Sequence, residues 1–292
     1  MNKTVNVYSK NDIVKLYNLS RTIPERVRLN YARRILGYTK AKTVMDAGFG
    51  TGLILVPLAK VAKPDQVIYG VDISKPMYRL VRKETVGFRN VILKVCGVHR
   101  LSSEFNNKFD VVHIKAITHI ARSPEKLLNR LSKLVKPGGY FVIGKEYSQP
   151  EDNLEWILKY KGKLDNNLYA FYKEYFKKRK LMGIPFKKPK MPAGDYDVAV
   201  SYLLKRGYKY ATEISNKDLR WKKRISFLEL VKAMKIGTFT VFRKRVSSVQ
   251  RKILARAMID YLQRNKIDAK RYRFYKAELR AVLLKKFSEN RT

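Results

Sequence analysis

The sequence has little cysteine and no long apolar run, and each absence narrows the possible classes of protein. Cys96 is the single cysteine, which excludes both a disulfide framework and a zinc site built from cysteines. The longest clean apolar runs, such as residues 53–59, fall far below the roughly 18 residues that a membrane span requires. Residues 1–15 contain no apolar segment of the kind found in signal peptides. We therefore expect a soluble, cytoplasmic protein without a membrane span or a metal centre.

Acidic residues are scarce as well. The 292 residues include 64 lysines and arginines but only 24 aspartates and glutamates, which gives a formal net charge of +40. Residues 1–150 carry 27 basic and 10 acidic side chains, a net charge of +17, and residues 151–292 carry 37 and 14, a net charge of +23. A surface this basic attracts polyanions such as nucleic acids or anionic lipid head groups. The alternative is codon drift in an AT-rich genome, which explains the lysines better than the shortage of acids.

The first half of the chain alternates between short apolar segments and amphipathic ones. Apolar, β-branched runs predict strands, and apolar residues at intervals of three and four predict helices. Ser74 and Ser123 are suitable N-caps for two of the helices. The expected strands are 43–47, 67–73, 91–96, 109–114 and 140–144, and the expected helices are 26–36, 51–62, 74–86 and 123–136. This alternation predicts an α/β domain with a parallel sheet and helices on both faces.

The second half has more aromatic residues and longer helical segments. The expected helices are 151–182, 195–206, 227–234 and 246–264, with one or two strands in 208–224 and a final strand over 272–286. We expect residues 1–147 to form the core domain, residues 148–207 a mobile helical cap or lid, and residues 208–292 the last strands with inserted helices. The cap would cover the carboxyl-terminal edge of the sheet, where open α/β sheets bind ligands.

A glycine-rich segment gives the sharpest signal for a ligand site. Residues 46–52 read Asp-Ala-Gly-Phe-Gly-Thr-Gly, follow the first expected strand and begin a helix. Glycines let the chain turn tightly and let a ligand approach the backbone, and the helix N-terminus adds a positive dipole. A dinucleotide-binding fingerprint would need glycine at position 53, where the sequence has leucine. Asp72, at the end of the next strand, offers a carboxylate that can accept hydrogen bonds from two ribose hydroxyls, or else caps the following helix.

The pattern acid-x-Gly-x-Gly-x-Gly resembles motif I of the class I S-adenosylmethionine (SAM) methyltransferases. Three further segments resemble the type 11, UbiE-like members of that class: Phe-Asp-Val-Val at 109–112, Pro-Glu-Lys-Leu-Leu at 124–128 and Leu-Val-Lys-Pro-Gly-Gly at 134–139. Tyr17 and Arg21 resemble the lead-in helix that folds over the cofactor in this family. The resemblance implies a Rossmann-like fold whose mostly parallel sheet has seven strands, with helices on both faces and a helical cap. It also implies SAM as the cofactor and S-adenosylhomocysteine (SAH) as its product.

The same resemblance assigns residues to the cofactor site. Those expected to contact SAM are Tyr17, Arg21, Asp46, Gly48, Phe49, Gly50, Gly52, Asp72, Ile73, Met77, Gly97, Val98 and Lys115. One position departs from the family pattern, because Gly97 stands where family members carry an acid that reads the adenine amine. We therefore expect the adenine amine to meet the backbone or water, or to go unrecognised.

The expected reaction is transfer of a methyl group from SAM to a small-molecule acceptor. Holding the reactants in line supplies roughly 7–11 kcal/mol of the barrier. A base assists if the acceptor atom carries a proton. His119 is the first candidate for this base, with Glu146 and Tyr147 as alternatives, although His119 could equally be a core or surface histidine.

The sequence leaves two other functions open. An RNA methyltransferase would use the basic surface and could stack bases on Tyr169, Tyr172 and Tyr175, although core packing is the commoner role of such a stripe. A non-catalytic binding factor would use the same fold without its chemistry, because a fold does not determine a function. Steeply salt-dependent RNA binding would favour the first alternative, and calorimetry with SAM tests the second.

Overall fold

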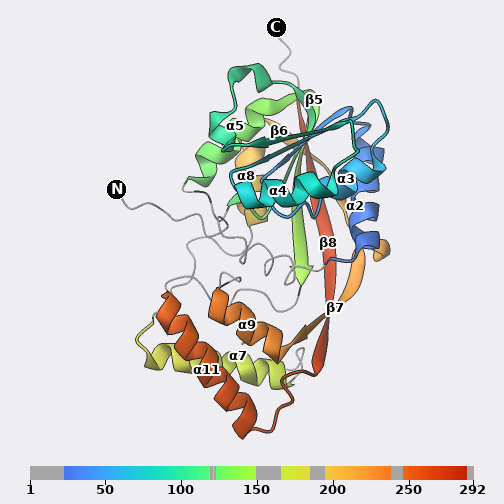
Figure 1. Ribbon diagram of the computed structural model, residues 1–292. Coiled ribbons are helices and arrows are strands. Elements are labelled where there is room, and N and C mark those ends of the chain that lie inside the picture. Colours follow the sequence, from blue (N-terminus) through green and yellow to red (C-terminus); the bar gives the residue numbers. More distant parts are fainter. Residues whose placement is uncertain are drawn as a thin grey trace.

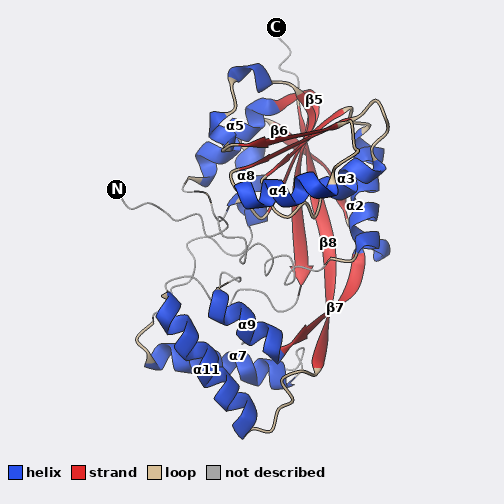
Figure 2. Ribbon diagram, viewed as in Figure 1, coloured by secondary structure: helices blue, strands red, loops and turns tan. Residues whose placement is uncertain are grey.

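Eight strands form one sheet in the computed structural model, which describes residues 23–118, 121, 123–148, 166–184, 195–237 and 246–287. The strands are β1 (Thr43–Ala47), β2 (Val67–Asp72), β3 (Val91–Val95), β4 (Phe109–Lys115), β5 (Val135–Ser148), β6 (Tyr208–Ile214), β7 (Arg220–Ser226) and β8 (Tyr272–Lys286). Their order is β3-β2-β1-β4-β5-β8-β6, and β7 pairs with β8 outside this path. β1 to β5 are parallel, and β8 is antiparallel to β5, β6 and β7. The expected α/β class with a mostly parallel sheet is confirmed (Figure 2).

The sheet has one strand more than the seven expected, and the reason is the length of β8. This strand has 15 residues, which span about 50 Å at the usual rise of a strand. Residues 277–285 pair with β5, whereas residues 272–278 pair with β7. An unpaired extension of β8 would leave a row of backbone N–H and C=O groups without partners. β7 therefore supplies the hydrogen bonds that the far half of β8 needs.

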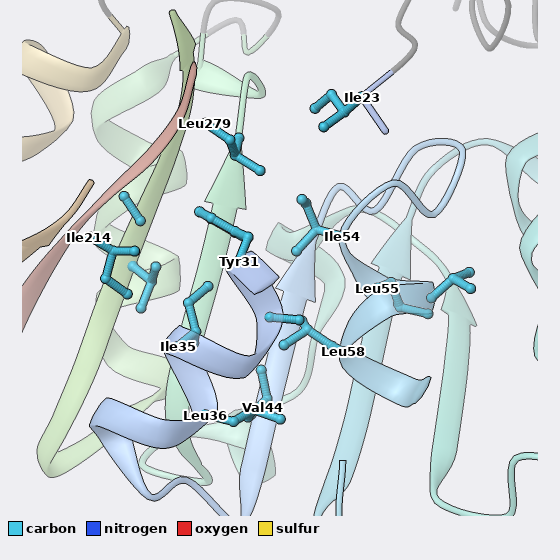
Figure 3. Close-up of a cluster of buried hydrophobic side chains, with 14 of the residues drawn as sticks. Ile23, Tyr31, Ile35, Leu36, Val44, Ile54, Leu55, Leu58, Ile214 and Leu279 are labelled. Atoms are coloured by element: carbon cyan, nitrogen blue, oxygen red, sulfur yellow. The ribbon is translucent and has the colours of Figure 1, made fainter. Parts of the chain in front are cut away.

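Helices cover both faces of the sheet. One face carries α2 (Glu25–Thr39), α3 (Leu55–Val61) and α4 (Lys75–Glu84), and the other carries α5 (Pro124–Leu134) and α8 (Asp195–Leu204). Figure 3 shows the core on the first face, where Tyr31, Ile35 and Leu58 pack between helices and strands. We call the strands β1–β6 with these helices, and the part of β8 that pairs with β5 and β6, the sheet lobe.

Serine residues set the start of two of these helices. The hydroxyl of Ser74 accepts a hydrogen bond from the N–H of Met77 at the start of α4. The hydroxyl of Ser123 accepts one from the N–H of Lys126 at the start of α5. Both caps satisfy backbone donors that have no partner within the first turn. The two expected N-caps are confirmed.

Three helices form a second lobe with a core of its own, which we call the helical lobe. They are α7 (Asn166–Leu181), α9 (Phe227–Ile236) and α11 (Ser248–Arg264). These helices lie in the lower part of Figure 1, and β7 and β8 extend down toward them. Phe171, Tyr175 and Phe227 are fully buried in the core of this lobe. The aromatic stripe of α7 therefore faces the interior, and Tyr172, which is also buried, does not offer an open platform for a base.

The helix expected over 51–62 begins only at Leu55. Gly50 and Gly52 have φ angles of 56° and 77°, which lie outside the range of a right-handed helix. The chain therefore makes a turn through the glycine-rich segment before α3 begins. This turn separates the end of β1 from the helix and leaves its backbone at the edge of the sheet.

The segment 148–207 contributes to both lobes. Its helix α7 packs with α9 and α11, whereas α8 packs against β5 and β6 in the sheet lobe. Residues 149–165 and 185–194 of this segment lie outside the described residues. None of the helices in the described ranges has the length and apolar character that a bilayer crossing demands.

Candidate functional site

The carboxyl-terminal ends of the parallel strands meet at one edge of the sheet, and the glycine-rich segment lies there. Gly48, Gly50 and Gly52 follow β1 with φ angles of 74°, 56° and 77°, a region that glycine enters without strain. A side chain at Gly48 would overlap that of Ile117. A Cβ at Gly50 would have only the Gly48 carbonyl oxygen nearby, at 4.0 Å, among the residues the structure describes. Gly48 is thus required for packing, and Gly50 leaves an open stretch of backbone.

Asp72 ends β2 directly beside this open backbone. Its Oδ2 accepts a hydrogen bond from the N–H of Gly50 at 2.8 Å, and its Oδ1 accepts one from the N–H of Ser74 at 2.8 Å. Burial raises the pKa of Asp72, and these two hydrogen bonds oppose the rise. Each carboxylate oxygen has two lone pairs, so both oxygens can accept a further hydrogen bond. Asp72 therefore combines a fixed position with free acceptor capacity.

A buried polar chain runs beside the glycine-rich segment. Nδ1 of His113 lies 2.8 Å from Oδ1 of Asp46, and Nε2 of His113 lies 3.1 Å from the hydroxyl of Tyr31. The exposed fraction of each residue is 3% or less. A carboxylate only accepts hydrogen bonds, so Nδ1–H donates to Asp46, and Nε2 of a neutral imidazole accepts from Tyr31. A Cβ at Gly144 would lie 2.5 Å from the Tyr31 hydroxyl, so glycine at this point of β5 makes room for the chain.

A second polar pair lies at the ends of β4 and β5. Nζ of Lys115 is 3.7 Å from Oε2 of Glu146, and the two side chains are only 10% and 7% exposed. Lys115 follows His113 by two residues in β4, and residues two apart in a strand share one face. This face therefore carries both the buried chain and a nearly buried carboxylate at the edge of the sheet. Such a carboxylate can accept a proton from a bound hydroxyl.

The ends of β2 and β3 form the other half of this edge. Ile73 follows β2, and its apolar side chain is 57% exposed. Met77 is buried in the first turn of α4, and Gly97 and Val98 follow β3. These four predicted residues thus follow the ends of two neighbouring strands, since Asp72 pairs in register with Val95, and Ile73 adds an exposed apolar surface there.

For the other predicted residues, the side chain either packs in the core or lies outside the described part of the structure. Phe49 is 4% exposed and its ring packs in the core beside Gly70. Tyr17, Arg21 and His119 lie outside the described residues. The backbone of Tyr147 pairs with Glu278 in the ladder between β5 and β8. The description of the structure does not extend to the Tyr147 side chain.

Three residues of this region were not expected from the sequence. His113 and Tyr31 complete the buried chain, and the signal for His113 is a polar residue inside the apolar run of β4. Thr51, within the glycine-rich segment, is buried, and its Oγ1 has no hydrogen-bond partner in the described part of the chain. A buried hydroxyl without a partner is uncommon and indicates an interaction with water or a bound molecule. Across the described ranges, no group of three or more His, Cys, Asp or Glu side chains is placed to hold a metal ion.

Comparison with known proteins places this geometry in a family. The methyltransferase domain family matches residues 38–184, half of the chain. A ubiquinone biosynthesis O-methyltransferase of Alkalilimnicola ehrlichii is 25% identical over 133 residues, which cover 45% of this chain and 53% of the relative. One of Shewanella halifaxensis is 29% identical over 117 residues, which cover 39% and 48%. The chain spans about half the length of the curated relatives it matches.

One solved structure supports the fold. The crystal structure of a candidate methyltransferase from Bacillus halodurans C-125 matches with a TM-score of 0.52 at 14% identity, over 89% of this chain and 99% of that chain. The glycine-rich turn after β1 agrees with the sequence pattern of motif I, and Asp72 lies at the end of β2 as expected. The chain therefore belongs to the methyltransferase domain family and has the fold of the class I SAM-dependent methyltransferases.

Proposed function

We propose that this protein transfers a methyl group from SAM to an oxygen atom of a small-molecule acceptor. The observation that carries the proposal is the open backbone at Gly50 held against the carboxylate of Asp72. This pair lies where the strand order turns, since β2 flanks β1 on one side and β4 on the other. Open α/β sheets bind their ligands at such a switch point. Membership of the methyltransferase family supplies the class of reaction.

The residues present fit SAM. Asp72 has lone pairs for the two ribose hydroxyls, and the turn around Gly50 leaves space for a ligand against the backbone. The buried hydroxyl of Thr51 has hydrogen-bonding capacity to spare. When bound, SAM supplies a methyl group activated by its sulfonium. The contacts proposed for the other residues of the cofactor set, from Tyr17 to Lys115, stay predictions.

The chain would contribute orientation, exclusion of water and removal of a proton. Orientation alone can supply roughly 7–11 kcal/mol of the barrier. We assign the proton acceptor to Glu146, because its carboxylate is nearly buried at the end of β5, on the same edge as Asp72. The ammonium of Lys115 holds this carboxylate at the edge. His119 and Tyr147 stay alternatives for the same role.

The relatives support an oxygen acceptor. Both relatives named above are O-methyltransferases of ubiquinone biosynthesis. We propose an acceptor of the same chemical class, a small hydroxylated molecule, whose hydroxyl loses its proton as the methyl group arrives. A base matched to that proton contributes about 10²–10⁴ in rate.

The test is formation of SAH from SAM in the presence of a catechol, a primary amine or RNA. We expect turnover with the catechol, and a loss of about 10²–10⁴ in kcat for Glu146→Gln with SAH affinity retained. The matched control is Glu125→Gln, which changes an exposed glutamate on α5 and should leave kcat unchanged. SAH binding without turnover of any acceptor would favour a non-catalytic binding factor instead.

RNA is the second candidate acceptor, and the net charge of +40 is the observation that favours it. Each phosphate contact adds about 0.9 to the salt slope on a duplex and about 0.7 on a single strand. We expect a shallow slope, since the basic residues occur in both halves of the chain. A steep slope that Lys222→Glu with Arg224→Glu flattens, together with methyl transfer to RNA that this pair abolishes, would replace the small-molecule proposal. Both side chains are exposed on β7.

A further inference from the structure

The imidazole of His99 occupies the space that a side chain at position 97 would fill. Gly97 has φ and ψ angles of −74° and 143°, an ordinary extended conformation that any residue adopts. The backbone therefore does not require glycine there. A Cβ on Gly97 would lie 2.5 Å from Cε1 and 2.8 Å from Nδ1 of His99. Glycine at position 97 is thus explained by the ring of His99, which covers it.

The position of this ring relative to Asp72 indicates what it faces. Asp72 pairs in register with Val95 at the end of β3, and Gly97 follows Val95 by two residues. The strand order β3-β2-β1 places Asp72 between the His99 turn and the glycine-rich segment. In SAM the ribose lies between the methionine part and the adenine. With the ribose at Asp72 and the methionine part at the glycines, the adenine must extend toward the end of β3.

The surroundings suit a purine ring. Ile73 presents a 57% exposed apolar side chain next to Asp72, and Val98 adds an almost buried one. His99 itself is exposed, and its imidazole makes no hydrogen bond within the described part of the chain. A neutral imidazole has one acceptor nitrogen and one N–H donor. The acceptor nitrogen can take a hydrogen bond from an exocyclic amine.

We propose that His99 reads the adenine amine of the cofactor, in the space where the resemblance places an acid. This inference rests on the proposed use of SAM at the edge of the sheet. It gives the pair Gly97 and His99 one joint role, because the glycine makes room for the imidazole and the imidazole supplies the acceptor atom. Recognition of adenine then depends on a residue two positions after the one that the family pattern indicates.

The first experiment measures the Kd of SAH and of an SAH analogue with hydrogen in place of the 6-amino group. We expect the wild-type protein to bind SAH about 3- to 10-fold more tightly than the analogue, the effect of one hydrogen bond between neutral groups. His99→Ala should bind both ligands equally. His99→Phe keeps a ring over Gly97 without either nitrogen and should also bind both equally. Arg100→Ala, which changes an exposed neighbour in the same turn, is the control and should keep the preference.

The second experiment replaces the imidazole of His99 by an acid at position 97 as the group that accepts a hydrogen bond from the adenine amine. The double variant Gly97→Asp with His99→Ala restores an acid and removes the ring that would obstruct it, so it should recover the preference for SAH. Gly97→Asp alone should bind SAH more weakly than the double variant, because the new side chain competes with the imidazole for space. Retention of the full preference in both His99→Ala and His99→Phe would overturn the proposal. If the wild-type protein binds neither ligand, the proposed function itself fails, which is a separate outcome.

Discussion

Two aspartates lie at opposite ends of the parallel strands, Asp110 at the amino-terminal edge of the sheet and Asp72 at the carboxyl-terminal edge, and their hydrogen bonds differ. Asp110, at the start of β4, accepts hydrogen bonds from the N–H groups of Lys42 and Thr43 at 2.9 and 2.8 Å and pairs with Nζ of Lys136 at 2.8 Å. Burial by itself raises the pKa of Asp110, but the bonds from Lys136 and Thr43 outweigh it and lower the pKa. The residues around Asp110 therefore stabilise its negative charge.

Asp72, at the carboxyl-terminal edge, accepts hydrogen bonds from backbone N–H groups alone and has no cation beside it in the described part of the chain. Burial raises its pKa, so the fold holds this charge at a cost in stability. At the amino-terminal edge the contacts of Asp110 stabilise the fold, whereas at the carboxyl-terminal edge Asp72 keeps acceptor capacity for a ligand. Binding sites commonly lower stability in this way, because groups kept ready for a ligand are not satisfied within the protein. The predictions below test how strictly the two edges divide these roles.

The largest expected effect concerns the buried hydrogen-bonded chain of Asp46, His113 and Tyr31. This chain lies near the carboxyl-terminal edge but is expected to stabilise the fold, so it is an exception to the division of roles between the two edges. His113→Leu leaves the carboxylate of Asp46 buried without its donor and the hydroxyl of Tyr31 without its acceptor. We expect the free energy of unfolding in urea to fall by about 3 kcal/mol. Tyr31→Phe should cost only about 1 kcal/mol, and Tyr38→Phe, an exposed tyrosine on the same helix, almost nothing. Equal stability of His113→Leu and the wild-type protein would show that this chain is not structural.

The next largest effect on stability is expected at Asp110, at the amino-terminal edge of the sheet. Asp110→Ala removes the acceptor of two backbone N–H groups and the partner of Lys136. The free energy of unfolding should fall by about 2 kcal/mol, while the Kd for SAH should not change. A variant that loses affinity for SAH as well would mean that the two edges are coupled.

A pair of glycine substitutions gives a matched comparison of the edges. Gly50 and Gly138 have φ angles of 56° and 76°, and a Cβ would meet no described atom closer than 4.0 Å at either position. Alanine should lower the free energy of unfolding by about 1 kcal/mol at each, because both conformations are left-handed. Only Gly50→Ala should also weaken SAH binding in calorimetry. Equal SAH affinities for the two variants would count against a ligand at Gly50.

The smallest effect is a pH dependence of opposite sign at the two aspartates. The pKa of Asp72 is raised above its ordinary value of 3.8, so the stability from its proton is complete below that pH and is lost as the pH rises through the raised pKa. Asp72→Asn should therefore be slightly more stable than the wild-type protein at neutral pH, and the gain should vanish in acid. The pKa of Asp110 is lowered, so its stabilisation is present above pH 3.8 and is lost as the pH falls through the lowered pKa. Urea unfolding across this range measures both, and a gain for Asp72→Asn that grows in acid would reverse the assignment.

Sequence patterns predicted the strands and turns around the glycine-rich segment and Asp72 well, because their sequence signals are local. The strand expected over 43–47 is confirmed as β1, and the glycine-rich turn and Asp72 lie at the ends of the strands where they were expected. Short apolar runs bounded by polar residues indicate such strands, and backbone positions with positive φ angles favour glycine, which is visible in the sequence.

The rest depends on contacts between distant segments. The pairing of β7 with β8 joins residues about 50 positions apart, and the bond between Asp46 and His113 joins residues 67 positions apart. No periodicity within either segment reports such contacts. The role proposed for His99 has no sequence motif, since its signal is the missing side chain at Gly97 beside the imidazole ring.

The most direct test of the central claim compares how much each of the two aspartates, Asp72 and Asp110, contributes to SAH binding. Calorimetry should give a Kd about 10- to 150-fold higher for Asp72→Ala than for the wild-type protein, which corresponds to about 1.5–3 kcal/mol for hydrogen bonds to a charged group. The matched variant Asp110→Ala, at the other edge of the same sheet, should bind SAH like the wild-type protein. An unchanged Kd in a folded Asp72→Ala protein, or equal losses in the two variants, would contradict a SAM site at the carboxyl-terminal edge.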